Sequence, residues 1–200
     1  YRNQKEAFNY NLARGKKYFE IDYINTADGN LVAMHSWDGF LKRFYGKDDF
    51  VIGKPLAYNE FMNLKSVNDY SQFDAKLSID WLRANPEAYF ITDIKGNNIA
   101  NLEKFIKPWA EGIMDRIIPQ VHSIEDYHKA KALGFNNIIF TSYMNKEKLD
   151  QIIEFTKTEK PFGITLTLDR FESGDYDPIK GIEDVRIFVH TINDLKQAED

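Results

Sequence analysis

The chain has 200 residues, 43% of them hydrophobic and 14% aromatic, so it is long enough for one domain with a substantial core and is not disordered as a whole. Its formal net charge of −5 argues against a nucleic-acid-binding surface, which is normally basic. The absence of cysteine excludes disulfides, thiolate nucleophiles and cysteine-ligated zinc. No apolar run has membrane-spanning length. Two bacterial locations stay open, namely the cytoplasm and the extracellular space or cell envelope.

The first elements are a helix and a short hairpin. The segment NQKEAFNYNLARG predicts a helix with Asn3 as its N-cap and Gly15 just after its end. YFEIDYI at 18–24 predicts a strand, and the Asp28-Gly29 pair predicts a turn into a second short strand, LVAMH. The aromatic-rich stretch that follows, about 36–86, predicts a small irregular insertion within a single domain covering residues 1–200.

From Phe90 onward, short apolar strands alternate with helical patterns. Helices are predicted at 98–114, at 123–134 with Ser123 as N-cap, and at 146–160. Barrel-type strands are predicted at 18–24, 89–94, 117–121, 137–142, 163–168 and 185–190. This alternation indicates a parallel sheet built from βαβ units.

Two parallel architectures fit six strands. A doubly wound sheet accepts six but usually has a glycine-rich phosphate turn after its first strand, and neither GxGxxG nor a Walker A pattern occurs. A closed (β/α)₈ barrel needs eight strands. We therefore predict an α/β fold, namely a TIM (β/α)₈-type barrel that lacks its first and last strands in this chain.

Polar residues occur late in these apolar strands, where ligands bind in parallel α/β folds. Glu20 and Asp22 point the same way because the strand pleat has a period of two, and two carboxylates are costly to bury without a cation or a shared proton. With Asp93 from another strand, they suit a divalent Ca²⁺ or Mg²⁺ ion. Simpler explanations stay open, namely a solvated edge strand for the first pair and an ion pair between Asp93 and Lys95.

Together these motifs resemble those of the glycerophosphodiester phosphodiesterase family, within the phospholipase-C-like phosphodiesterase superfamily. The family has E-x-D, T-x-D-G-x-x-V, His-Asp and E-x-K where this chain has EID, TADGNLV, His35-Ser36 and DIK. The resembling stretches span nearly the whole chain and are NQKEAF, FEIDY, NTADGNLVAMHSWD, FITDIK, IIPQV, NNIIFT and VHTIND.

The resemblance implies a metal-dependent enzyme that hydrolyses glycerophosphodiesters to an alcohol and glycerol phosphate. By position, Glu20, Asp22 and Asp93 would hold the Ca²⁺ or Mg²⁺ ion. His35 would be one of two catalytic histidines, and Lys95 would stabilise developing negative charge. The residues expected to contact the small-molecule phosphodiester substrate are Gln120, Tyr143 and Asn193.

The chain departs from the family pattern in ways that leave other roles open. The family's first catalytic histidine lies upstream of NQKEAF, so we expect the natural protein to extend upstream. Asp93 stands where many members have Glu, and Ser36 where many have Asp. The Asp-x-Lys pattern is similar to that of the sphingomyelinase D branch, which forms a cyclic phosphate by attack of a substrate hydroxyl. A non-catalytic barrel that binds a phosphorylated polyol or a glycan, and a purely structural role, are the further alternatives.

Overall fold

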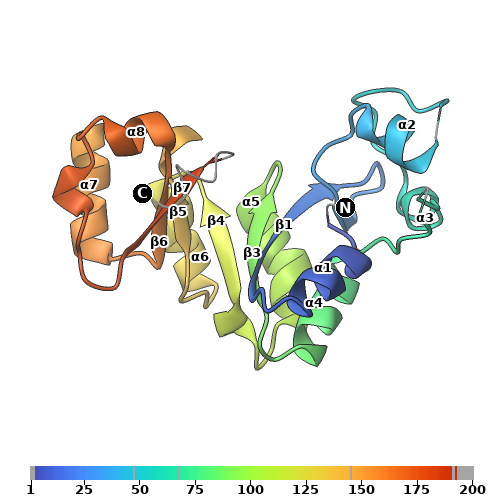
Figure 1. Ribbon diagram of the computed structural model, residues 1–200, viewed down its shortest axis with the longest axis horizontal. Coiled ribbons are helices and arrows are strands. Elements are labelled where there is room, and N and C mark those ends of the chain that lie inside the picture. Colours follow the sequence, from blue (N-terminus) through green and yellow to red (C-terminus); the bar gives the residue numbers. More distant parts are fainter. Residues whose placement is uncertain (1–2, 47, 67, 145, 191, 193–200) are drawn as a thin grey trace. The chain divides into compact units, whose positions relative to one another are not determined.

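The computed structural model describes residues 3–46, 48–66, 68–144, 146–190 and 192 (Figure 1). The chain forms two compact units, residues 1–117 and residues 118–200, which we call the first unit and the second unit.

Three strands form the sheet of the first unit, β1 (Tyr18–Asn25), β2 (Leu31–Ala33) and β3 (Tyr89–Ile94). β1 pairs antiparallel with β2 and parallel with β3. The predicted turn between β1 and β2 is closed by a hydrogen bond from the Thr26 amide to the Asn30 carbonyl oxygen (2.8 Å), and Gly29 takes the left-handed conformation that this turn needs (φ +79°).

The helices of the first unit are α1 (Lys5–Leu12), α2 (Phe40–Tyr45), α3 (Tyr58–Met62), α4 (Ala75–Ala84) and α5 (Asn98–Asn101). α4 begins after Asp74, whose carboxylate accepts a hydrogen bond from the Leu77 amide, as a helix N-cap should. The segment 36–86 was predicted to be irregular, but it contains the three helices α2, α3 and α4. α4 was missed although its buried residues Ala75, Ser78, Ile79 and Leu82 recur at helical spacing, which was the available signal.

One face of the β1–β3 pair is apolar and is covered by α1 and α4 (Figure 1). Phe8 of α1 and Trp81 of α4 both contact Phe90 of β3, with ring centroids 5.4 and 5.5 Å apart. The members of this aromatic cluster are Phe8, Phe19, Phe73, Trp81 and Phe90. Because side chains alternate along a strand, burial of this face directs the intervening residues of β1 and β3 to the opposite face.

A second apolar cluster holds the segment that follows β2. Trp37 is buried in it, and its indole N–H donates to the Asn25 carbonyl oxygen at the end of β1 (3.0 Å). The buried members of this cluster are Val32, Met34, Trp37, Leu41, Phe50, Leu56 and Phe61. The segment is thereby attached to the end of the sheet that carries the polar residues.

The second unit contains four parallel strands in the order β4 (Ile117–Val121), β5 (Ile139–Thr141), β6 (Gly163–Thr167) and β7 (Arg186–His190). Its helices are α6 (Ile124–Ala132), α7 (Leu149–Glu159) and α8 (Leu168–Glu172). Phe155 of α7 lies 4.9 Å, between ring centroids, from both Tyr127 of α6 and Phe140 of β5. Gly163 has no room for a side chain, because a Cβ atom there would lie 2.4 Å from the Phe188 ring.

The predicted fold class is confirmed. All six predicted barrel-type strands are present, although β5 is shorter than the predicted 137–142, and the chain is a mixed α/β protein with mostly parallel strands. The described strands do not close into a complete barrel. No helix within the described ranges is both long enough and apolar enough to cross a membrane.

Two local predictions were wrong. The N-cap of α1 is Gln4, not Asn3, which has a left-handed backbone (φ 60°) and uses its side chain elsewhere. The single helix predicted over 98–114 is instead α5, a π-helical turn at Leu102–Ile106 and a 3₁₀ turn at Lys107–Trp109. Pro108 explains the break, because it has no N–H to donate and its ring disfavours regular helix before it.

The aromatic cluster yields a stability prediction. Phe90→Ala removes a fully buried ring between α1 and α4, and we expect it to lower the free energy of unfolding by about 3–5 kcal/mol. Tyr10→Ala, which truncates an aromatic side chain that is 62% exposed on α1, should change it by less than about 0.5 kcal/mol. Urea denaturation followed by circular dichroism measures both. Equal midpoints for the two variants would show that the cluster does not stabilise the first unit.

Candidate active site

The parallel register of β1 and β3 brings two carboxylates side by side. Asp22 lies directly opposite Asp93, and both point away from the aromatic cluster. Asp22 is buried, with 8% of its surface exposed, and Asp93 is half-buried. Like charges opposite one another on neighbouring strands repel, so this pair requires a compensating cation.

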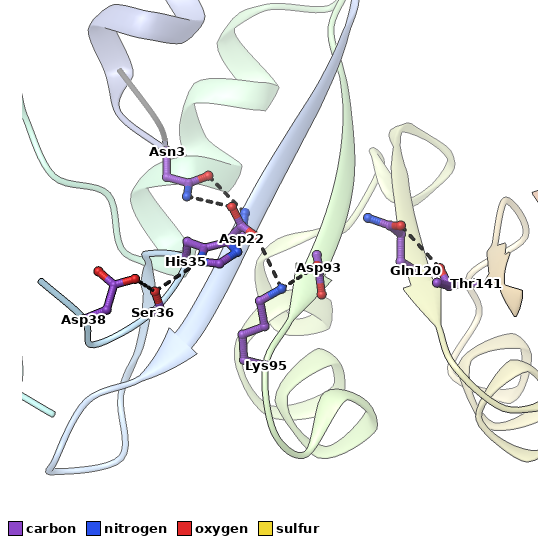
Figure 2. A network of polar contacts seen from close by, with 9 residues as sticks. All are labelled: Asn3, Asp22, His35, Ser36, Asp38, Asp93, Lys95, Gln120 and Thr141. Atoms are coloured by element: carbon purple, nitrogen blue, oxygen red, sulfur yellow. Dashed lines mark hydrogen bonds and ion pairs between the residues drawn. The ribbon is translucent and has the colours of Figure 1, made fainter. Parts of the chain in front are cut away.

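Lys95 supplies that cation in the first unit. Its ammonium lies 2.5 Å from Asp93 Oδ2 and 3.5 Å from Asp22 Oδ1 (Figure 2). The backbone amide of Lys95 donates to the Tyr23 carbonyl oxygen (2.8 Å), which extends the β1–β3 pairing and keeps Lys95 on the same face as Asp93. Burial lowers the pKa of Lys95, but the hydrogen bond and the negative charge of Asp93, with the charge of Asp22, outweigh it and leave the pKa raised. The ammonium is therefore charged at neutral pH.

Asn3 fixes the orientation of the Asp22 carboxylate. The Asn3 side-chain amide donates to Asp22 Oδ2 (3.0 Å), and its carbonyl oxygen accepts from the Asp22 backbone amide (3.0 Å). Each carboxylate oxygen of Asp22 thus has a partner, Asn3 on one side and Lys95 on the other (Figure 2). Sequence reasoning missed this role because it read Asn3 as a helix cap. The left-handed backbone, which asparagine tolerates better than most residues, aims the side chain at β1.

Glu20 is not in register with Asp93. It precedes Asp22 by two positions on the same face of β1, but it is exposed and lies opposite Ile91. Among the residues that the structure describes, no group of three or more histidine, aspartate or glutamate side chains is close enough to hold a metal ion. The structure brings together Asp22 and Asp93, and the full set with Glu20 stays a prediction.

The donor chemistry of the pair suits a hard cation. Oxygens of Asp22 and Asp93 already share one ammonium, so they converge on a common point from two strands. Carboxylate oxygens are the ligands that Ca²⁺ and Mg²⁺ prefer, with water or a substrate phosphate completing the coordination. The two aspartates therefore fit a divalent ion, and Lys95 would have to share their negative charge with it.

His35 follows β2 in the first unit. Its ring is exposed, and its Nδ1 lies 3.1 Å from the Ser36 hydroxyl oxygen. The Ser36 hydroxyl in turn donates to Asp38 Oδ2 (2.5 Å). Sequence reasoning identified His35 but not its connection to Asp38. The H-S-x-D spacing was the available signal, because short polar side chains two residues apart can bond within one turn.

The predicted substrate contacts lie in the second unit. Gln120, near the end of β4, is buried, and its amide oxygen accepts a long hydrogen bond from the Thr141 hydroxyl of β5 (3.4 Å). The Tyr143 ring follows β5 and lies 4.3 Å, between centroids, from the ring of His190 at the end of β7. These side chains gather where parallel strands end, as a ligand site would require. Asn193 lies outside the described residues.

No protein-family model matches the chain, and no curated protein matches its sequence. Solved structures match its fold. The glycerophosphodiester phosphodiesterase from Thermotoga maritima is 20% identical with a TM-score of 0.69, and the match covers 98% of this chain and 82% of that chain. The glycerophosphodiester phosphodiesterase from Agrobacterium tumefaciens is 17% identical with a TM-score of 0.67, covering 98% and 83%.

A third match is a phosphodiesterase from Oleispira antarctica, whose structure was solved in complex with the product sn-glycerol-3-phosphate. It is 16% identical with a TM-score of 0.66, and the match covers 98% of this chain and 83% of that chain. The family resemblance seen in the sequence is thus matched by a likeness of fold over nearly the whole chain.

The position of Lys95 predicts competition with a bound ion. Lys95→Met removes a positive charge within 3.5 Å of both aspartates, so we expect Ca²⁺ to bind about tenfold more tightly or better, because like charges at this distance repel. Isothermal titration calorimetry measures the dissociation constant. Lys16→Met, which removes an exposed lysine at the start of the β1 strand region, is the control and should leave it unchanged. Weaker or equal Ca²⁺ binding in Lys95→Met would contradict the competition.

Proposed function

Because the chain has the fold of solved glycerophosphodiester phosphodiesterases, we propose that it is a metal-dependent phosphodiesterase that hydrolyses glycerophosphodiesters to an alcohol and glycerol phosphate. The observation that carries this proposal is the pairing of Asp22 with Asp93 in register, with Lys95 bonded to both. A phosphodiester carries a negative charge that increases locally as the bond to its leaving group breaks. A site that gathers cations on paired carboxylates is suited to that chemistry.

The metal ion would be held by Glu20, Asp22 and Asp93. Asp22 and Asp93 already converge on one cation, and Glu20 projects from the same face of β1. A bound Ca²⁺ or Mg²⁺ supplies Lewis-acid neutralisation of the phosphate oxygens. Asn3 would keep the Asp22 carboxylate from rotating away when the charge on the site changes, because it holds Oδ2 and the backbone amide together.

Lys95 and His35 would act on the substrate itself. Lys95, whose pKa is raised by its aspartate partners, stays protonated and offers positive charge where the departing oxygen becomes negative. His35 has an exposed ring, and an imidazole nitrogen can take a proton from attacking water or give one to the departing alkoxide.

Substrate contacts beyond the phosphate would come from Gln120, Tyr143 and Asn193. The Gln120 side-chain amide can form hydrogen bonds with glycerol hydroxyls, and the Tyr143 ring packs at a tilt of 49° against the ring of His190 at the strand ends of the second unit. The Oleispira antarctica phosphodiesterase holds sn-glycerol-3-phosphate. By analogy, we propose that every substrate of this protein contains a glycerol phosphate group.

A second outcome of the same chemistry is a cyclic phosphate. It is suggested by the Asp93-x-Lys95 pattern, which is similar to that of the sphingomyelinase D branch and in which Asp93 holds the lysine at 2.5 Å. Phosphorus-31 NMR of the products with glycerophosphocholine distinguishes the two reactions, since hydrolysis yields glycerol phosphate and cyclisation yields a five-membered cyclic phosphodiester. A protein that binds the ligand without consuming it would support the non-catalytic alternative.

The role of His35 predicts a split between binding and turnover. We expect His35→Ala to abolish hydrolysis of glycerophosphodiesters while leaving Ca²⁺ affinity nearly unchanged, because the ring contributes protons and not metal ligation. Coupled release of glycerol phosphate and calorimetry measure the two quantities. Full activity in His35→Ala would remove this residue from the mechanism.

If Glu20, Asp22 and Asp93 hold the metal ion, two polar variants should differ in metal affinity. Glu20→Gln removes a negative charge beside the aspartate pair and should weaken Ca²⁺ or Mg²⁺ binding by about tenfold or more, because these ions bind carboxylate oxygens far better than amides. Gln120→Ala removes only a neutral amide and should change the metal dissociation constant little. Comparable constants for the two variants would argue that Glu20 is not a ligand.

A further inference from the structure

Three polar side chains form a short hydrogen-bonded chain after β2. His35 Nδ1 lies 3.1 Å from the Ser36 hydroxyl oxygen, and that hydroxyl donates to Asp38 Oδ2 (2.5 Å), as Figure 2 shows. The hydrogen bonds therefore run from an exposed imidazole through a hydroxyl to a carboxylate. None of these contacts is needed to build the aspartate pair on β1 and β3.

Counting the hydrogens of His35, Ser36 and Asp38 shows which group donates each of the two hydrogen bonds. A serine hydroxyl has a single hydrogen, and an ionised carboxylate can only accept. Since the Ser36 hydrogen is directed to Asp38, the Ser36 oxygen can only accept from His35. The neutral imidazole then carries its hydrogen on Nδ1, and the lone pair is on Nε2.

The backbone that carries this chain is anchored on both sides. Met34 and Trp37 flank the pair His35-Ser36 and are both buried, with 4% and 7% of their surfaces exposed. The Trp37 carbonyl oxygen accepts from the Gly53 amide (2.6 Å), and its indole is bonded to the end of β1. The backbone at His35 is thus held in place by its neighbours. The side chains bonded to its ring then decide which ring nitrogen carries the hydrogen.

We infer that Ser36 and Asp38 are positioning residues that hold His35 in the Nδ1–H tautomer and so present Nε2 as the atom that exchanges protons with the substrate. The inference rests on the proposed function for the catalytic use of Nε2, but not for the tautomer itself. When Nε2 takes the proton released by the attacking water, the ring becomes positive, and the bond chain ending on the Asp38 carboxylate stabilises that charge. If His35 acts instead as the acid, the doubly protonated ring gives its Nε2 proton to the departing alkoxide and returns to the Nδ1–H form.

The tautomer can be measured without any turnover. Nitrogen-15 NMR of the imidazole rings at about pH 8, above the ordinary histidine pKa of about 6.5, reports which ring nitrogen carries hydrogen. The chain has four histidines, and a His35→Gln spectrum identifies the signal of interest. We expect predominantly Nδ1–H in the wild type and loss of that preference in Ser36→Ala and in Asp38→Ala. In Asp38→Ala the Ser36 hydroxyl is released and can donate to Nδ1 instead.

A conservative variant provides the rescue. In the double variant Ser36→Asp/Asp38→Ala, a carboxylate at position 36 can accept directly from Nδ1, so the Nδ1–H tautomer should return. Asp48→Ala, which removes an exposed carboxylate from the same segment, is the matched control and should leave the tautomer unchanged. For turnover, we expect Ser36→Ala and Asp38→Ala to lower kcat by about 10- to 100-fold with little change in KM, and the double variant to recover much of it.

The outcomes separate this inference from the proposed function. Tautomer changes as described, in a protein with no phosphodiesterase activity, would uphold the positioning roles and reject the activity. An unchanged tautomer in both Ser36→Ala and Asp38→Ala would overturn the inference even if turnover fell. Failure of the double variant to restore Nδ1–H, while it remains folded by circular dichroism, would also overturn it.

Discussion

The arrangement of the first unit depends on the compensation of two negative charges by one lysine. The register of β1 and β3 pairs Asp22 with Asp93, and both lie on one face because residues that alternate with them along the strands, such as Phe19 and Phe90, pack in the aromatic cluster on the opposite face. Their mutual repulsion is offset by Lys95, which bonds to both. Hydrophobic packing of one face thus leaves two neighbouring carboxylates on the other face. Their repulsion is relieved because the Lys95 ammonium binds between them.

The parts around that site restrict motion rather than add charge. Asn3 holds both the carboxylate and the backbone amide of Asp22, at the cost of an unusual backbone conformation. The segment carrying His35 is fixed by the burial of its neighbours Met34 and Trp37. Proton transfer and metal binding both depend on distances held within fractions of an ångström, so such anchoring is what the proposed phosphodiesterase activity would require.

The second unit contributes polar side chains by a different route. Its strands are apolar along their length, and Gln120, Thr141, Tyr143 and His190 come at or just after their carboxyl ends. Parallel strands bring all such ends to one edge of a sheet, which is why this class of fold gathers ligand-binding residues from distant parts of a chain. Gln120, Thr141 and Tyr143 carry neutral polar groups, in contrast to the charged set on β1 and β3.

The sequence by itself determined the strands, the helices α1, α6 and α7 and the identity of the charged residues, because period-two and period-3.6 patterns and cap residues such as Ser123 are local properties. Its family motifs also pointed to the fold that the solved structures share. The sequence patterns wrongly indicated Asn3 as a cap and one helix over 98–114, and they did not predict α2, α3, α4 or α8. Only the tertiary structure decided that Asp22 faces Asp93 and that Asn3 is hydrogen-bonded to Asp22. Those contacts join residues 19 or more positions apart, and strand register and side-chain rotamers, which no local pattern encodes, set them.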